Sequence, residues 1–270
     1  MDLDDALLDD VDALIAADAR QLLPMTASAG ASMRAAAALT TPEVIERIAD
    51  DGRPHAVVVV GGGGSRAAGD ILAAVAGSGS PVPVMTFGGP SLPGWVGPTD
   101  LVVAVSGSGR TPETLAVAAE AARRGCRLVV VSPDRTPLAY LAEQTRGAAS
   151  VPVGVPTVSG TWRARTLMWS LATPLVLMSG GLGLVEDADA AVDAAARVLD
   201  ALDQAVWTRQ RAGHDGFDTL VHHSDRGAQY TSIALSERLA ETGIAASVGA
   251  VGSSYDNALA EAIKCRHRHL

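Results

Sequence analysis

The residues of this chain that could hold a small anion are gathered in two glycine- or serine-rich stretches. The first reads GGGGSRAAGD over 61–70 and directly follows the apolar run 56–60. The second reads SGSGRTPET over 106–114 and directly follows the apolar run 101–105. Glycines let the backbone approach an anion closely, and a helix that starts beside them offers unpaired N–H groups and its positive dipole end. Both stretches therefore predict loops that hold a phosphate group.

The second stretch has the more specific pattern, because Ser106, Ser108 and Thr111 supply three hydroxyl groups that can donate to phosphate oxygens. The alternative is a purely structural role, in which the glycines only permit tight strand-to-helix turns. A dinucleotide site is disfavoured, since 61–66 lacks a G-x-G-x-x-G pattern and no acidic residue closes the next strand near 85. The candidate phosphate- and sugar-binding residues are Gly63, Gly64, Ser65, Ser106, Gly107, Ser108 and Thr111.

The elements that must position these loops are short apolar runs that alternate with helical patterns. Such valine-rich runs are typical of a parallel sheet covered by helices on both faces. The predicted strands are 56–60, 81–85, 101–105, 127–132 and 149–153. The predicted helices between and after them are 65–76, 111–124, 136–146 and 161–180, with helical stretches at 3–22 and 28–50 before them. The pattern predicts a flavodoxin-like, doubly wound α/β domain.

The composition limits the class of protein. An apolar fraction of 48% supplies a full core, and a net charge of −9 makes nucleic acid an improbable main partner. Two unrelated cysteines, Cys126 and Cys265, and an acidic N-terminal stretch favour a reduced, cytoplasmic protein. The uncharged segment 166–185 is long enough to span a bilayer. Pro174 and a glycine-rich end favour a buried helix instead, so we expect no membrane association.

These residues resemble a known family. The run Ser106–Thr114, together with Gly63, Gly64 and Ser65, resembles a sugar-isomerase (SIS) domain, in particular the bifunctional phosphoglucose/phosphomannose isomerases. The resemblance covers about residues 1–185. It implies that the hydroxyls hold the phosphate of a sugar such as fructose 6-phosphate, without a cofactor, and that the domain can form a homodimer. It also implies that Arg163, with Arg165 as the alternative, stabilises the enediolate intermediate.

The sequence departs from that family in two ways. Arg66 stands where the family has a small residue, which either crowds the sugar or adds a cation for the phosphate. The catalytic glutamate, histidine and lysine of the family lie in a second SIS domain, and no matching motif follows residue 185. Isomerisation needs a base that moves a proton between two carbons. We therefore expect an isomerase relative that binds a sugar phosphate without turning it over.

The end of the chain has a different pattern. The segments HHSDRGAQYTS (222–232) and SYDNALAEA (254–262) place Asp225 at the end of a predicted strand, 219–224, and Glu261 in a final helix, with 35 residues between the two acids. Carboxylates of this kind hold divalent metal ions that activate water and stabilise a phosphodiester leaving group. Each acid taken alone would be an ordinary surface residue.

Residues 195–262 resemble the integrase core of insertion-sequence DDE transposases, which have an RNase H-like fold. The resemblance implies that Asp225 and Glu261 are two of three metal-binding acids, with Mg²⁺ as the metal only if the fragment is active. The first aspartate of that family lies on a strand well upstream, where this chain carries the SIS pattern. We therefore predict an SIS domain over 1–190 followed by a partial RNase H-like fragment over 195–270.

Three functional hypotheses remain open. The first is an inactive isomerase relative fused to a transposase remnant, and the second is a sensor that binds a sugar phosphate. The third comprises the active alternatives, a DDE-type DNA integration protein or an aldose–ketose phosphosugar isomerase.

Overall fold

A computed structural model describes most of the chain between residues 28 and 200 and two short strands beyond it. The described residues are 16, 26, 28–154, 163–200, 205, 221–224 and 245–248. The chain divides into two compact units, one of Ala29–Val198 and one of Met1–Ser28 with Leu199–Leu270. The candidate phosphate loops belong to the first unit. The predicted domain limits at 190 and 195 stay predictions, and helix α10 (Ala188–Val198) crosses them as part of the first unit.

A five-stranded, fully parallel sheet forms the centre of the first unit, in the order β2-β1-β3-β4-β5. This is the doubly wound order predicted from the sequence. Strands β3 and β4 have the predicted bounds. The strands are β1 (Val57–Val60), β2 (Val84–Phe87), β3 (Leu101–Val105), β4 (Arg127–Ser132) and β5 (Ala149–Pro152).

Strand β2 begins three residues later than predicted. The prediction counted Pro81 and Pro83 as strand residues, but proline has no N–H to donate to a ladder. Only the carbonyl of Pro83 takes part, accepting from the N–H of Val57 at 2.9 Å. As an edge strand β2 is also partly exposed, whereas β1 and β3 are buried throughout. The uniform burial expected for all strands therefore holds for the central ones and not for this edge.

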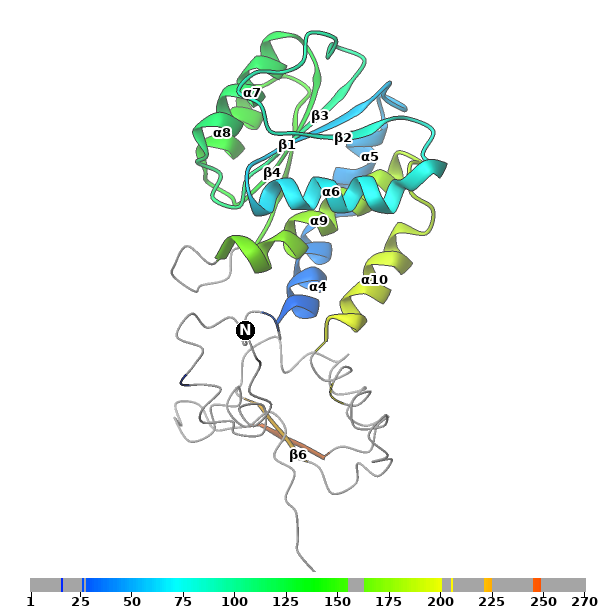
Figure 1. The fold of residues 1–270 in the computed structure, drawn as a ribbon, viewed down its shortest axis with the longest axis vertical. Helices are drawn as coiled ribbons and strands as arrows, with labels where there is room; N and C mark the ends of the chain where they lie inside the picture. The colour runs from blue at the N-terminus through cyan, green and yellow to red at the C-terminus, as the bar shows by residue number, and fades with distance from the viewer. Residues whose placement is uncertain are drawn as a thin grey trace, which may run out of the picture. The chain divides into compact units, whose positions relative to one another are not determined.

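Helices cover both faces of the sheet (Figure 1). On one face, α7 and α8 pack on even-numbered residues of β1, β3 and β4, such as Val58, Val102 and Val130, in one hydrophobic cluster. On the other face, α6 and α9 pack against each other, and α4, α5 and α10 pack against α9. The helices are α4 (Ala29–Leu39), α5 (Pro42–Ala49), α6 (Gly64–Ala76), α7 (Pro112–Arg123), α8 (Pro137–Gln144), α9 (Arg163–Gly181) and α10, with a 3-10 turn η1 (Gly77–Gly79) after α6.

Helix α9 is the buried helix that was predicted for the uncharged segment. It continues through Pro174, and Leu171, Leu175 and Met178 are at most 3% exposed. Within the part of the chain that the structure describes, no helix is long and apolar enough to cross a membrane. The segment is therefore part of the core of the first unit.

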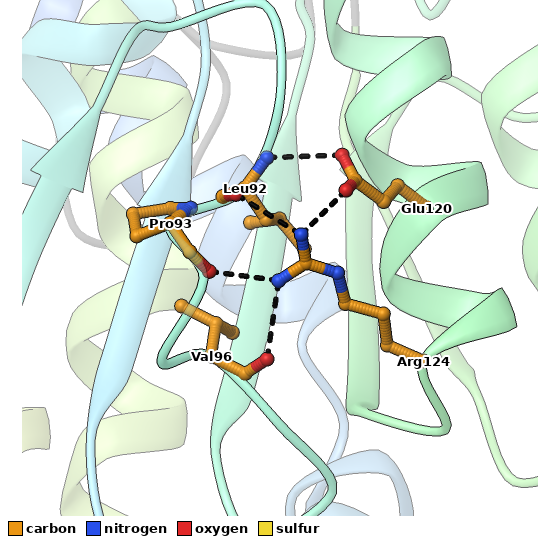
Figure 2. A network of polar contacts seen from close by, with 5 residues as sticks. All are labelled: Leu92, Pro93, Val96, Glu120 and Arg124. Atoms are coloured by element: carbon orange, nitrogen blue, oxygen red, sulfur yellow. Dashed lines mark hydrogen bonds and ion pairs between the residues drawn. The ribbon is translucent and has the colours of Figure 1, made fainter.

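The long connection between β2 and β3 is fixed to α7 by one arginine (Figure 2). The Arg124 guanidinium donates to the carbonyl oxygens of Leu92, Pro93 and Val96 at 2.7–3.3 Å, and to the carboxylate of Glu120 at 2.6 Å. The other oxygen of Glu120 accepts from the N–H of Leu92 at 3.0 Å. The connection thereby keeps Leu92 and Val96 buried against α7.

The second unit contains two described strands, β6 (Val221–Ser224) and β7 (Ala245–Val248). They pair in parallel, with Val221 opposite Ala245. Strand β6 falls within the predicted strand 219–224 and ends one residue before Asp225.

Candidate phosphate-binding site

The two predicted loops lie next to each other because β1 and β3 are neighbours in the sheet. Both loops leave the carboxyl ends of their strands, at the point where the strand order reverses. A Cβ atom at Gly61 would lie 3.0 Å from the carbonyl oxygen of Val105, so glycine lets the first loop touch the end of β3. The N–H of Gly107 points to the Ser65 hydroxyl at 3.4 Å, which connects the second loop to the first.

The three hydroxyls of the second loop form a cluster, called here the hydroxyl cluster (Ser106, Ser108 and Thr111). The Oγ atom of Ser106 is 3.0 Å from Oγ1 of Thr111 and 3.4 Å from Oγ of Ser108. Ser108 and Thr111 are 3.5 Å apart at the same atoms. Ser106 is 2% exposed, while Ser108 is open to solvent. Each hydroxyl can rotate its hydrogen from a neighbour toward an arriving anion.

Glycine and backbone bonds shape the turn that carries this cluster. Gly109 has a φ of +61°, a left-handed conformation that favours glycine. Its N–H donates to the Ser106 hydroxyl at 3.0 Å, and the N–H of Arg110 donates to the Ser108 hydroxyl at 3.2 Å. Among the described residues, the cluster bonds to hydroxyls and backbone N–H groups and not to a carboxylate or an imidazole. The site is therefore suited to an anion.

The helices that start at these loops, α6 and α7, lack side-chain caps in the described part of the chain. The residues that precede them are Gly63 and Thr111. Thr111 instead turns its hydroxyl toward Ser106. Helix α8 starts at the same edge of the sheet and is capped, because Thr136 accepts from the N–H of Ala139. The two uncapped helix starts direct their positive dipole ends to the same place.

Helix α9, which lies on the same face of the sheet as α6, packs against the loop that carries the hydroxyl cluster. A Cβ atom at Gly107 would lie 2.1 Å from Cδ2 of Leu167, so this helix packs directly against the turn. Arg163, the predicted intermediate-stabilising residue, is the first residue of α9, one turn before Leu167. The side chains of Arg163 and Arg165 lie outside the described residues, so the role of Arg163 stays a prediction.

Arg66, where the sequence departs from the isomerase family, lies in the first turn of α6 with an exposed side chain. Its guanidinium extends toward the end of β2, where a Cβ atom at Gly88 would be 3.4 Å from Nη1. The cation is therefore at the rim of the site on the β2 side.

The structure brings together the predicted residues of both loops, Gly63, Gly64, Ser65, Ser106, Gly107, Ser108 and Thr111, at one edge of the sheet. Sequence reasoning missed the junction of β4 and α8, where Thr136 and Leu138 contact Gly109. The Thr136-Pro137 pair repeats the Thr111-Pro112 pattern at a helix start, and this repeat was the available signal.

Among the described residues there is no group of three acids, histidines or cysteines that could hold a metal. Asp225 and Glu261 lie outside the described residues.

The sheet order, the helices on both faces and the two loops at the reversal point define the first unit as a doubly wound, flavodoxin-like α/β domain. The structure is similar to that of a protein assigned as a phosphosugar isomerase from Silicibacter pomeroyi, with a TM-score of 0.53, 18% identity, and coverage of 84% of this chain and 70% of that one. It is also similar to tagatose-6-phosphate ketose/aldose isomerase from Escherichia coli, with a TM-score of 0.50, 13% identity, and coverage of 82% and 64%. At these identities the likeness concerns the fold.

The relatives found by sequence are transposases, the class of protein that residues 195–262 resemble. A protein assigned as the transposase of insertion sequence element IS986/IS6110 from Mycobacterium tuberculosis is 66% identical over 70 residues, 26% of this chain and 25% of that protein. The transposase of IS629 from Shigella sonnei is 54% identical over 66 residues, 24% of this chain and 20% of that protein. The chain thus spans about a quarter of these relatives. No protein-family model matches it. The chain combines an α/β domain whose fold is similar to that of phosphosugar isomerases with a segment similar in sequence to insertion-sequence transposases, as predicted.

Proposed function

We propose that the first unit binds a phosphorylated sugar at the hydroxyl cluster, with the phosphate held by Ser106, Ser108 and Thr111. The observation that carries the proposal is the mutual approach of these hydroxyls, 3.0–3.5 Å apart, in front of an uncapped helix start. Hydroxyls, backbone N–H groups and a helix dipole together favour a phosphate over a neutral group. The names of the structural relatives, a phosphosugar isomerase and a tagatose-6-phosphate isomerase, support a sugar phosphate as the ligand.

Fructose 6-phosphate is the ligand we propose to test first, by isothermal titration against the full chain, with fructose as the ligand that lacks phosphate. Hydrogen bonds to a charged group contribute about 1.5–3 kcal/mol each, so Ser106→Ala should weaken binding roughly ten- to a hundredfold. Ser80→Ala is the matched control. The Ser80 hydroxyl donates to the carbonyl oxygen of Val82 just before β2, at the amino ends of the strands and away from the phosphate loops. Equal affinities for fructose and fructose 6-phosphate would overturn the proposal.

We further propose that the site binds this ligand without isomerising it. The reaction needs a group that accepts a carbon-bound proton. Among the described residues, no carboxylate or imidazole is hydrogen-bonded to the hydroxyl cluster. A coupled assay for glucose 6-phosphate should therefore show no formation above a protein-free blank. Enzyme-dependent formation that disappears in Ser106→Ala would contradict this part of the proposal.

A further inference from the structure

The loop between β4 and α8 forms the back of the hydroxyl turn. The space that a side chain at Gly109 would fill is occupied by Thr136, whose Oγ1 and Cβ atoms would lie 2.2 and 2.4 Å from a Cβ atom there. The carbonyl oxygen of Gly109 accepts from the N–H of Leu138 at 3.1 Å, in the first turn of α8. Gly109 is thus held on one side by Thr136 and Leu138 and on the other by the Ser106 hydroxyl.

Thr136 is itself rigidly placed. It is 6% exposed, and its hydroxyl donates to the carbonyl oxygen of Pro133 at 2.9 Å. The same hydroxyl is 3.2 Å from Oγ of Ser132, which is completely buried, and it accepts from the N–H of Ala139 at 3.4 Å. These bonds fix the side chain at the start of α8, and the helix is fixed in the core by Leu138 and Ala142.

We propose that Thr136 is a positioning residue of the phosphate site: through Gly109 it sets the place of the Ser106 and Ser108 hydroxyls. The chain of contacts runs from Thr136 to Gly109, and from the N–H of Gly109 to the Ser106 hydroxyl at 3.0 Å. The affinity for a sugar phosphate then depends on a residue that need not touch the ligand. The effect on affinity rests on the proposed function, whereas the effect on the turn does not.

The test compares two substitutions in the full chain. Thr136→Val keeps the branched shape but replaces the hydroxyl by a methyl group, which removes the bonds to Pro133 and Ser132 and presses on Gly109. Thr136→Ser keeps the hydroxyl. We expect Thr136→Val to weaken the binding of fructose 6-phosphate by about tenfold, as for the loss of one hydrogen-bonded group, and Thr136→Ser to restore most of the affinity.

Hydrogen exchange of the peptide covering 106–111 in the ligand-free protein gives the second readout. Exchange at this turn should be faster in Thr136→Val and unchanged in Thr136→Ser. Thr145→Val is the matched control, because it removes a hydroxyl from the other end of α8 that donates to the carbonyl oxygen of Leu141 at 2.7 Å, away from Gly109. If Thr136→Val does not fold, Thr136→Ala carries the same comparison without the added methyl group.

The outcomes separate the two proposals. Unchanged exchange at 106–111 in Thr136→Val, or an equal increase in Thr145→Val, would overturn the positioning role. If the wild-type protein binds no fructose 6-phosphate, the proposed function fails, and the exchange comparison still decides whether Thr136 sets the turn. Faster exchange in Thr136→Val alone, together with weaker binding, supports both.

Discussion

Glu120 and Arg124 show how two charged residues can organise a loop without forming a site. The pKa of the Glu120 carboxyl is lowered below its usual range, mainly by the hydrogen bond from the N–H of Leu92. The hydrogen bond from Arg124 lowers this pKa further. Because the guanidinium also binds three carbonyl oxygens, protonation of Glu120 weakens the contact that keeps the β2–β3 connection on α7 (Figure 2). The network belongs to the fold, and it predicts that the fold is sensitive to acid.

The prediction at the residue scale concerns that sensitivity. A carboxyl whose pKa is lowered on folding stabilises the native state above its unfolded pKa, and the contribution is lost as the pH falls through the folded-state value. The urea midpoint of the wild-type protein should therefore fall as the pH drops below the ordinary glutamate pKa of about 4.3, and it should fall less steeply in Glu120→Gln. Glu143→Gln, at an exposed residue of α8, is the control. Parallel pH profiles for wild type and Glu120→Gln would disprove the assignment.

At the scale of elements, the approach of α6 to the sheet depends on one glycine. A Cβ atom at Gly69 would lie 2.4 Å from Cγ2 of Thr86 and 2.8 Å from Cγ1 of Val59. Both neighbours are β-branched strand residues, which are stiff about χ1 and cannot swing away. The helix that presents Ser65 to the site is therefore held close to β1 and β2 by the lack of a side chain.

We expect Gly69→Ala to destabilise the protein by about 1–3 kcal/mol, as overpacking of a well-packed interface does, even though alanine favours helix. Gly79→Ala is the control, since a Cβ atom there meets nothing within 4 Å. Chemical denaturation of the two variants and the wild type measures the difference. A Gly69→Ala protein as stable as Gly79→Ala would show that α6 can shift without cost.

How much of the site the sequence predicts depends on whether its contacts are local. The hydroxyl cluster lies within six consecutive residues, so composition and the preceding strand were enough to find it. The bounds of β3 and β4 were predicted because each contains a run of buried apolar residues, which in β4 lies between Arg127 and Ser132. The Ser65–Gly107 bond and the Gly109–Thr136 contact join different loops, so they follow only from the order of the strands. Side-chain placement at Arg163, Asp225 and Glu261 stays predicted.

At the scale of the whole molecule, every described residue of the phosphate site belongs to the unit Ala29–Val198. That unit has its own sheet, helices on both faces and a continuous core. The transposase-like segment supplies none of the described contacts of the site. Ligand binding should therefore be a property of the first unit.

Removing residues 199–270 tests this division. The shortened chain should bind fructose 6-phosphate with the affinity of the full chain and should still unfold in a single cooperative transition, as expected for one domain with its own core. Titration calorimetry and a thermal melt measure the two properties. Loss of binding with an intact melt would show that residues 199–270 contribute to the site, and loss of the melt would show that they support the fold.

The central strands of the sheet have a consequence for how this chain reaches its folded state. Strand β1 is VVVV and β3 is LVVAV, both buried and free of charge. Uncharged, valine-rich stretches without proline have the composition of segments that stack into fibrillar cross-β assemblies. Parallel strands pair only after the intervening helix has crossed over, which makes their burial slow. Folding of this protein therefore competes with aggregation of the exposed strands. Because aggregation depends on concentration, dilute conditions favour the folded state.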